Sequence, residues 1–199
     1  SRLWSVSGRS FTNLRNPGQN QSAAWSRFPS AGATGMMQAM PPKIVTKEQL
    51  VEQLQPLRAG GSRIVFTNGC FDLMHIGHTR YLQAAKSLGD LLVVGVNSDE
   101  SVRSLDKAPD RPIVPDAQRA EVVAALGCVD YVVVFSEPDP KALITAVQPD
   151  VLVKGGDWSV DRIIGRDVVE ARGGRVQTIP LVHGFSTTAL IHRIRSASA

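Results

Sequence analysis

Apolar residues along residues 46–199 recur with two periods, one typical of helices and one typical of buried strands. A capping box formed by Thr46 and Gln49 predicts the start of a helix, and Gly60-Gly61 predicts its end. After it, short apolar runs alternate with stretches whose apolar positions share one helical face. This alternation predicts an α/β fold with a doubly wound parallel sheet and right-handed crossovers. The predicted strands are 63–68, 91–97, 131–135, 151–153 and 175–179, and the predicted helices are 78–88, 116–126, 140–147, 167–171 and 187–194.

The beginning of the chain follows neither period. Residues 1–42 are rich in Ser, Gly, Asn, Gln and Arg, so we predict a disordered tail there. An N-terminal helix at 43–61 and a folded domain at 62–199 are expected to follow. Two interpretations of the tail stay open: an Arg- and Ser-rich transit segment, or an extended start with the natural beginning near Met37 or Met40. We favour the second.

The formal net charge of +4 is divided unevenly along the chain. Residues 1–47 hold six basic groups and no acidic group, whereas residues 48–199 hold 16 basic and 18 acidic groups. The predicted folded part is therefore slightly acidic, which argues against a nucleic-acid partner. The chain has no apolar run of about 18 residues, so we expect no membrane partner. Cys70 and Cys128 form neither a disulfide framework nor a metal-type pair, which favours a cytoplasmic location.

One segment combines glycines, histidines and a predicted helix start. Residues 68–78, directly after the first predicted strand, read Asn-Gly-Cys-Phe-Asp-Leu-Met-His-Ile-Gly-His. Gly69 permits a turn without a Cβ, and Gly77 permits close approach of the backbone to a phosphate. His75 and His78 share one helical face, next to the free N–H groups of a helix N-terminus. The segment predicts a phosphate site, although it matches neither a P-loop nor a GxGxxG turn.

A zinc pair is the alternative for the two histidines, because their i, i+3 spacing also suits a metal. Zinc would need two further ligands, and the other histidines, His183 and His192, lie far along the chain. We therefore expect no metal held by protein side chains at this segment.

The segment resembles the motif of the HxGH nucleotidylyltransferase superfamily. The similarity covers residues 62–195 and extends most closely to the adenylyltransferase domain of the bifunctional heptose kinase/adenylyltransferases and its stand-alone relatives. A single HxGH would be a weak signal, whereas an ordered series of matching segments is specific. The further matches are Asn97-Ser98-Asp99, Lys107, Asp110-Arg111-Pro112-Ile113, Gln118-Arg119, Val129-Asp130-Tyr131, Lys154-Gly155-Gly156-Asp157-Trp158 and Gly184-Phe185-Ser186-Thr187-Thr188.

The resemblance implies a Rossmann-like five-stranded sheet with strand order 3-2-1-4-5. In that order ligands bind between strands one and four, at their carboxyl ends, so residues 68–78 and 154–158 would face one crevice. The implied activity is transfer of AMP from ATP to D-glycero-β-D-manno-heptose 1-phosphate. The products would be pyrophosphate and ADP-heptose, which serves lipopolysaccharide or S-layer glycan synthesis.

The implied reaction needs no general base, because the acceptor phosphate is already anionic. The site must instead hold two polyanions in line. By resemblance the catalytic residues are His75, His78 and Lys107, with Lys107 on a loop that could close over the phosphates. Mg²⁺ is expected to arrive with ATP, since the sequence shows no dense carboxylate cluster. The implied nucleotide-binding residues are Gly69, Cys70, Phe71, Gly77, Arg119, Lys154, Gly155, Gly156, Asp157, Ser186, Thr187 and Thr188.

Three residues and one segment have alternative roles. Asp72 either orients the motif loop or helps hold Mg²⁺, or it simply caps the turn. Arg119 either donates to phosphate oxygens or is an ordinary surface arginine. Trp158 either lines the base or acceptor pocket, together with Asp157, or is an ordinary packing residue without a ligand role. The Ser186–Thr188 segment either caps the last helix or binds an anion, and the two can coexist.

Two other functions are alternatives to heptose 1-phosphate adenylyl transfer. One is a cytidylyltransferase acting on glycerol 3-phosphate or another small phosphate or phosphonate, and the other is a non-catalytic nucleotide-binding regulator. Leu181 and Gly156 stand where the glycerol-phosphate enzymes carry Arg and Asp, which weakens the first. Intact His75, His78 and Lys107 argue against the second. The loop around Lys107 lacks both glycines of the family pattern GKGPDRP, which leaves the pose of that lysine open. We expect a stand-alone form without a kinase domain, and the resemblance suggests a homodimer.

Overall fold

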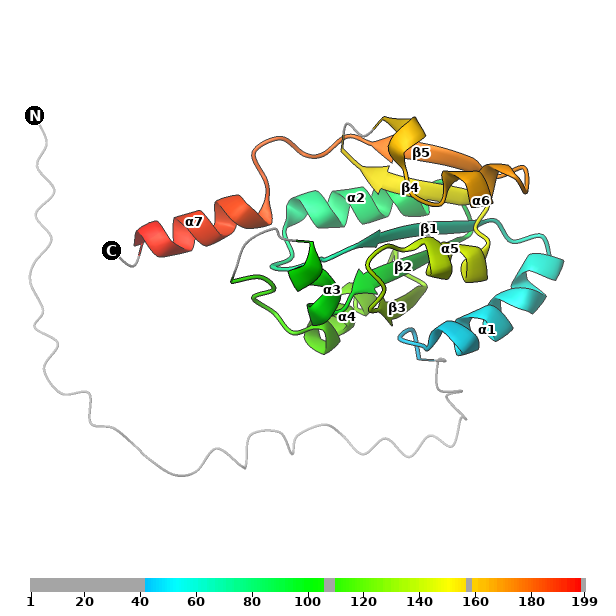
Figure 1. Ribbon diagram of the computed structural model, residues 1–199, viewed down its shortest axis with the longest axis horizontal. Helices are drawn as coiled ribbons and strands as arrows, with labels where there is room; N and C mark the ends of the chain where they lie inside the picture. The colour runs from blue at the N-terminus through cyan, green and yellow to red at the C-terminus, as the bar shows by residue number, and fades with distance from the viewer. Residues whose placement is uncertain (1–41, 106–109, 157–158, 198–199) are drawn as a thin grey trace, which may run out of the picture. The chain divides into compact units, whose positions relative to one another are not determined.

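The computed structural model describes residues 42–105, 110–156 and 159–197, and shows a parallel sheet with helices on both faces (Figure 1). The strands are β1 (Ile64–Gly69), β2 (Leu91–Asn97), β3 (Tyr131–Phe135), β4 (Val151–Gly155) and β5 (Arg175–Ile179). The helices are α1 (Lys47–Ala59), α2 (Ile76–Lys86), α3 (Asp99–Ser104), α4 (Asp116–Ala124), α5 (Lys141–Val147), α6 (Arg166–Glu170) and α7 (Thr187–Ala197), with a 3₁₀ turn η1 (Val160–Arg162). The tail predicted at 1–42 lies outside the described residues except for Pro42, as do Lys107, Asp157 and Trp158.

The sheet has the order β3-β2-β1-β4-β5, which confirms the order implied by the resemblance. All neighbouring strands are parallel, and β1 lies in the centre, paired with β2 along its length and with β4 at Val65 and Phe66. Parallel strands all end at the same edge of the sheet, so the segments that follow β1 and β4 lie beside each other. The two most specific motifs are thereby placed at one switch point.

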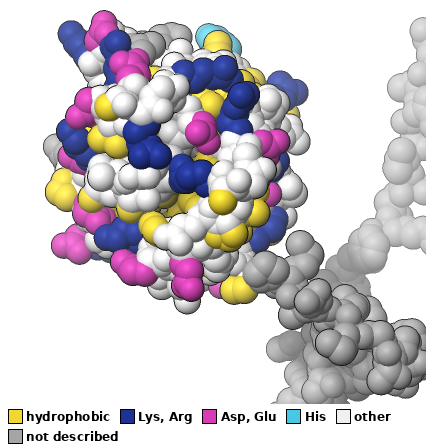
Figure 2. Space-filling view, turned by 90° about the vertical axis from the view of Figure 1, so that its right-hand side faces the viewer, with side chains coloured by type: hydrophobic (Ala, Val, Ile, Leu, Met, Phe, Trp, Pro, Cys, Tyr) yellow, Lys and Arg dark blue, Asp and Glu magenta, His cyan; other side chains and the backbone are white. Residues whose placement is uncertain are grey.

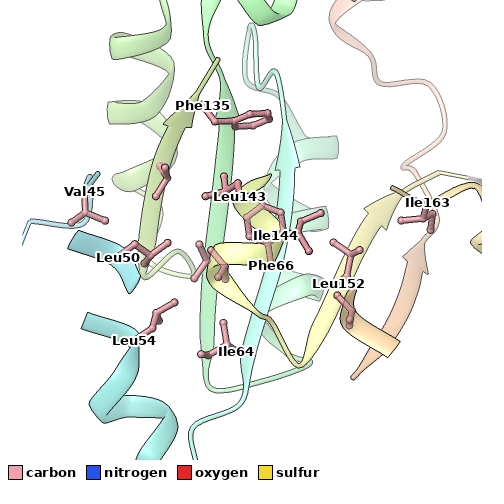
Figure 3. Close-up of a cluster of buried hydrophobic side chains, with 14 residues drawn as sticks. Val45, Leu50, Leu54, Ile64, Phe66, Phe135, Leu143, Ile144, Leu152 and Ile163 are labelled. Carbon is pink, nitrogen blue, oxygen red and sulfur yellow. The ribbon is translucent and has the colours of Figure 1, made fainter. Parts of the chain in front are cut away.

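Two layers of buried side chains attach the helices to the sheet. On one face, Ile64 and Phe66 of β1 pack with Leu50 of α1 and Ile144 of α5 (Figure 3). On the other face, Val65 packs with side chains of α2 and α4. Successive residues of a strand point to opposite faces, so β1 contributes to both layers. This central position makes β1 a rigid base for the segment that follows it.

Several helix boundaries differ from the prediction by one to three residues, and helix α3 was not predicted. α2 begins at Ile76 rather than His78 and ends at Lys86, and α4 ends at Ala124, two residues before the predicted end. Helix α3 follows Ser98, whose hydroxyl accepts the Ser101 amide at 3.1 Å. It has six residues, and Val102 is its only buried apolar residue. A single apolar position gives no period, so the pattern could not indicate this helix.

The face at the amino ends of the strands carries Lys and Arg side chains interspersed with Asp and Glu (Figure 2). Mixed charge of this kind is typical of a solvated surface and does not form the single-sign stripe of a nucleic-acid site. Among the residues that the structure describes, no helix is long and apolar enough to cross a membrane. The chemistry predicted from the motifs lies at the opposite edge, where the strands end.

Candidate active site

A cavity of about 330 Å³ opens where β1 and β4 end. Its walls are the segment after β1, the start of α2, Gly155 at the end of β4 and the segment that leads into α7. A larger hollow of about 780 Å³ runs along α1 and β3, but none of the motif residues line it. The smaller cavity is therefore the candidate site, because most of the described motif residues line it.

Most residues predicted for the site line this one cavity. Lys154 and Gly156 flank Gly155 at the end of β4 without lining the cavity, and Arg119 lies elsewhere. The predictions for Lys107 and Asp157 concern residues outside the described part of the chain. The predicted residues that do line the cavity are Gly69, Cys70, Phe71, Asp72, His75, Gly77, His78, Gly155, Ser186, Thr187 and Thr188.

The motif loop, residues 70–75 between β1 and α2, adopts an unusual backbone conformation that Asp72 holds in place. Phe71 and Leu73, on either side of Asp72, have φ angles of 50° and 47°, a left-handed conformation that is costly for residues other than glycine. The Asp72 carboxylate is buried and accepts hydrogen bonds from Arg111 Nε at 2.6 Å and from the amides of Ile113 and Val114, both at 3.0 Å. These three bonds favour the structural alternative for Asp72, because they occupy the oxygens that a metal would need.

The two histidines of the motif stack on each other at the start of α2. His75 is the N-cap residue, and its Nδ1 accepts the Gly77 amide at 3.1 Å. In a neutral ring this bond leaves Nε2–H as the donor. The His78 ring lies 3.9 Å from the His75 ring, centroid to centroid, and touches the Phe71 ring edge-on at 5.6 Å. One histidine thus caps the helix while the other is held between two rings.

Gly77 is needed for the packing of the His75 ring. A Cβ at this position would lie 2.8 Å and 2.9 Å from the Cε1 and Nδ1 atoms of His75, closer than real contacts allow. The sequence predicted only a close approach of backbone to phosphate here. The structure adds a second reason for glycine, since any side chain would displace the capping ring.

Helix α7 begins beside the same loop. Thr187 donates its hydroxyl to the backbone carbonyl of Asp72 at 2.7 Å, and the Ser186 hydroxyl accepts the amide of Ala189 at 3.1 Å. Thr187 is the only buried residue of this helix within the part that the structure describes. The first turn of α7 is therefore fixed to the motif loop, and Ser186, Thr187 and Thr188 at its start line the cavity.

The end of β4 faces the motif loop from the other side. Lys154 Nζ donates to Asn68 Oδ1 at the end of β1, which joins the two strands across the switch point. A Cβ on Gly155 would lie 3.1 Å from the Leu181 side chain and 3.2 Å from the Tyr81 ring. Glycine therefore lets both side chains pack against the end of β4. The predicted facing of the two motifs is thus confirmed for Gly155, which lines the cavity, and Lys154 bonds to the end of β1 beside it.

The structure contradicts one of the two predictions made for Arg119. Its side chain is 1% exposed, so it is not a surface arginine, and it does not line the cavity. Its guanidinium donates to the carbonyls of Val114 and Cys70 and to the Asp99 carboxylate. Through these bonds the Arg119 side chain joins the motif loop, at Cys70, to Val114 and Asp99. The direct phosphate contact implied by the resemblance stays a prediction.

The cavity is also lined by residues to which the sequence analysis assigned no role at the site, namely Asn68, Tyr81, Arg111, Leu181, Val182 and Phe185. Arg111 was noticed only as part of a matching segment, and the signal that could have marked it was its charge within that segment. The Tyr81 hydroxyl bonds to Thr67 at 2.6 Å and donates to the Val153 carbonyl at 3.2 Å, and burial raises its pKa to about 12. Tyr81 therefore stays protonated and joins β1 to β4.

The protonation of His75 is predicted to change when a polyphosphate binds. Burial lowers the pKa of His75 from its usual value, so the neutral ring is favoured in the free protein. A bound polyanion favours the charged ring and raises the pKa. ATP binding at about pH 6.5 should therefore take up protons, which calorimetry in buffers of different ionisation enthalpy measures.

The matched variant for this measurement is His75→Gln, which cannot titrate. The difference between the two proteins removes the contribution of ATP itself. The same direction applies to stability: the neutral ring in the fold stabilises the protein above the ordinary histidine pKa, and this contribution is lost as the pH falls below it. Equal proton uptake by the two proteins would contradict the assignment to His75.

No group of three or more His, Cys, Asp or Glu residues within 42–105, 110–156 and 159–197 is arranged to hold a metal ion. Asp72, the one carboxylate among the described residues that line the cavity, is already bonded to Arg111 and two amides.

Known proteins resemble this chain in sequence and in fold. A family model for cytidylyltransferase-like proteins matches residues 66–193. The bifunctional protein HldE of Syntrophotalea carbinolica is 54% identical over 152 residues, which are 76% of this chain and 31% of that protein. HldE of Geobacter sulfurreducens is 55% identical over 140 residues, 70% of this chain and 28% of that protein. The chain thus spans less than a third of the length of these relatives.

A solved structure agrees with the sequence comparison. The lipopolysaccharide core biosynthesis protein from Thermoplasma volcanium GSS1 is similar with a TM-score of 0.52 and 30% identity, over 61% of this chain and 98% of that chain. The family model covers more than half of the chain, and its span contains the whole motif loop and the start of α7. The chain belongs to the cytidylyltransferase-like family.

Proposed function

We propose that this protein transfers AMP from ATP to D-glycero-β-D-manno-heptose 1-phosphate, giving ADP-heptose and pyrophosphate. The observation that carries the proposal is the cavity at the ends of β1 and β4, where two stacked histidines and the starts of two helices converge. Helix N-termini and imidazole donors suit a polyphosphate, because both offer N–H groups to anionic oxygens.

In the proposed reaction, an oxygen of the acceptor phosphate attacks the α-phosphorus of ATP, and the bond from that phosphorus to the pyrophosphate oxygen breaks. The nucleophile is already anionic, so the protein's task is to align two anions and stabilise the charge of the leaving group. His75 and His78 are proposed to donate to the α-phosphate. Lys107 is proposed as a further cation, and the start of α7 as a second anchor for phosphate oxygens.

The choice of ATP and a heptose phosphate rests on the relatives and on one substitution, at Leu181. Both HldE proteins are more than 50% identical to this chain over the matched residues. The similar solved structure is named as a lipopolysaccharide core biosynthesis protein. Leu181 lines the cavity in place of the arginine of glycerol-phosphate enzymes, which removes a cation from that wall. We therefore favour a sugar 1-phosphate over glycerol 3-phosphate.

The proposal includes Mg²⁺ bound mainly to the triphosphate, where it would neutralise charge on the β- and γ-phosphates. The described side chains fit this arrangement, since Asp72 is already engaged. A homodimer that acts in the cytoplasm is proposed from the resemblance.

One experiment tests the function directly. The protein is incubated with ATP, CTP, GTP or UTP, Mg²⁺ and a panel of sugar and polyol phosphates, and pyrophosphate release is measured. Release with ATP and heptose 1-phosphate supports the proposal, and release only with CTP and a polyol phosphate replaces it with the cytidylyltransferase. Nucleotide binding without release from any pair would instead support a regulator.

A further inference from the structure

Arg111 is the only Lys or Arg that lines the candidate cavity within the described part of the chain. A cavity that holds a nucleoside triphosphate and a sugar phosphate must neutralise several negative charges. Histidines can lose their charge near neutral pH, whereas a guanidinium cannot. Among the described lining residues, the permanent positive charge of the site therefore rests on Arg111.

Asp72 holds this arginine by one edge. Arg111 Nε donates to Asp72 Oδ2 at 2.6 Å, and the two side chains are 8% and 0% exposed. The guanidinium carries five N–H donors, so this bond leaves the Nη1 and Nη2 groups for a ligand. The carboxylate also accepts two backbone amides, which orient it and hence the arginine. A buried arginine fixed in this way can bind an anion without losing much side-chain freedom.

Asp72 also places Arg111 near the start of α7. The carboxylate of Asp72 bonds to Arg111, while its backbone carbonyl accepts the Thr187 hydroxyl at 2.7 Å. The neighbouring residue, Asp110, forms an ion pair with Arg195 of the same helix. Two sources of positive charge, the guanidinium and the first turn of α7, thus lie on either side of one residue. The stacked histidines, at the start of α2, form a separate group.

We propose that Arg111 binds the β- and γ-phosphates of the nucleotide and, with the start of α7, holds the departing pyrophosphate. This inference rests on the proposed function. When the acceptor oxygen bonds to the α-phosphorus, the bond to the β-phosphate breaks and its electron pair goes to the pyrophosphate oxygen. Arg111 stabilises that charge by hydrogen bonding, and no proton is transferred. Asp72 is then a positioning residue, because it acts through Arg111.

The test is Arg111→Lys, which keeps a cation beside Asp72 but loses the paired N–H donors of the guanidinium. Binding of ATP, AMP and inorganic pyrophosphate is measured by calorimetry for this variant, for Arg111→Gln and for the wild type. In Arg111→Lys, affinity for ATP and pyrophosphate should fall about 10–100-fold, since a bidentate contact is lost. Affinity for AMP, which lacks the β- and γ-phosphates, should stay the same. Arg80→Gln, an exposed position on α2, is the matched control and should bind like the wild type.

Each other outcome overturns a defined part of the inference. Unchanged ATP binding with a raised KM for the sugar phosphate would move the contact to the acceptor. Equal loss of ATP and AMP binding, with a lower melting temperature in both arginine variants, would mean that Arg111 has only a structural role. Unchanged binding of all ligands would also refute the proposal. A wild type that binds no ATP would refute the proposed function instead.

Discussion

Replacing His78 by alanine is expected to lower kcat of the proposed adenylyl transfer by about 10²–10³-fold, the usual cost of one donor to transition-state charge. His78 is the cleaner of the two motif histidines to test. His75 caps α2 through Nδ1, so its removal also weakens the helix, whereas His78 is held by ring contacts with His75 and Phe71. The measurement is steady-state pyrophosphate release with saturating ATP and heptose 1-phosphate.

His192→Ala is the matched control, because His192 lies exposed on α7 and contacts only Ser196 among the interactions that the structure records for it. This variant should keep the wild-type kcat. Thermal melting of both variants separates lost chemistry from lost folding. A His78→Ala protein that is folded and turns over at the wild-type rate would remove His78 from the catalytic residues.

Replacing Asp72 by alanine is expected to lower the free energy of unfolding by about 3–5 kcal/mol, the range for breaking a buried ion pair by removing one partner. Arg111 would remain buried without its carboxylate, and the amides of Ile113 and Val114 would lose their acceptor. The left-handed residues on either side of Asp72 would also lose the bonds that hold them. Urea unfolding without nucleotide or Mg²⁺ measures the effect.

The control for this measurement is Asp167→Ala, which breaks an exposed ion pair with Lys141 and should leave the free energy of unfolding almost unchanged. The result also separates the two roles that the sequence left open for Asp72. If Asp72 served only to bind Mg²⁺, its removal would not destabilise the metal-free protein. Wild-type stability of Asp72→Ala would therefore contradict the structural role.

The strand pattern and the motif glycines could be predicted from the sequence because they depend on local periodicity and local backbone needs. Apolar runs marked all five strands, and the segment after β1 was recognisable from Gly69 to His78. The start of α2 was placed two residues late because its cap is a histidine, which is not among the usual capping residues. Helix α3 lacks a repeating apolar face and was missed.

The roles of the charged residues could not be predicted, because they depend on partners far along the chain. Asp72 bonds to Arg111, 39 residues away, and the sequence offered no means of pairing them. Arg119 has ordinary helix neighbours, yet its guanidinium is buried against Cys70, 49 residues earlier. Whether an arginine lines a cavity or bonds to a loop depends on the groups that surround its guanidinium, and these follow from the tertiary fold.

The meeting of distant segments at Asp72 also determines when the site can appear during folding. Its partners lie 39 to 42 residues away in one segment and 115 residues away in α7. Such contacts have a high entropic cost of loop closure and form only after the parallel strands have paired. Partly folded chains should therefore have little affinity for nucleotide. A ligand that binds only the finished fold stabilises it by mass action, so the proposed ATP ligand would protect this protein from unfolding.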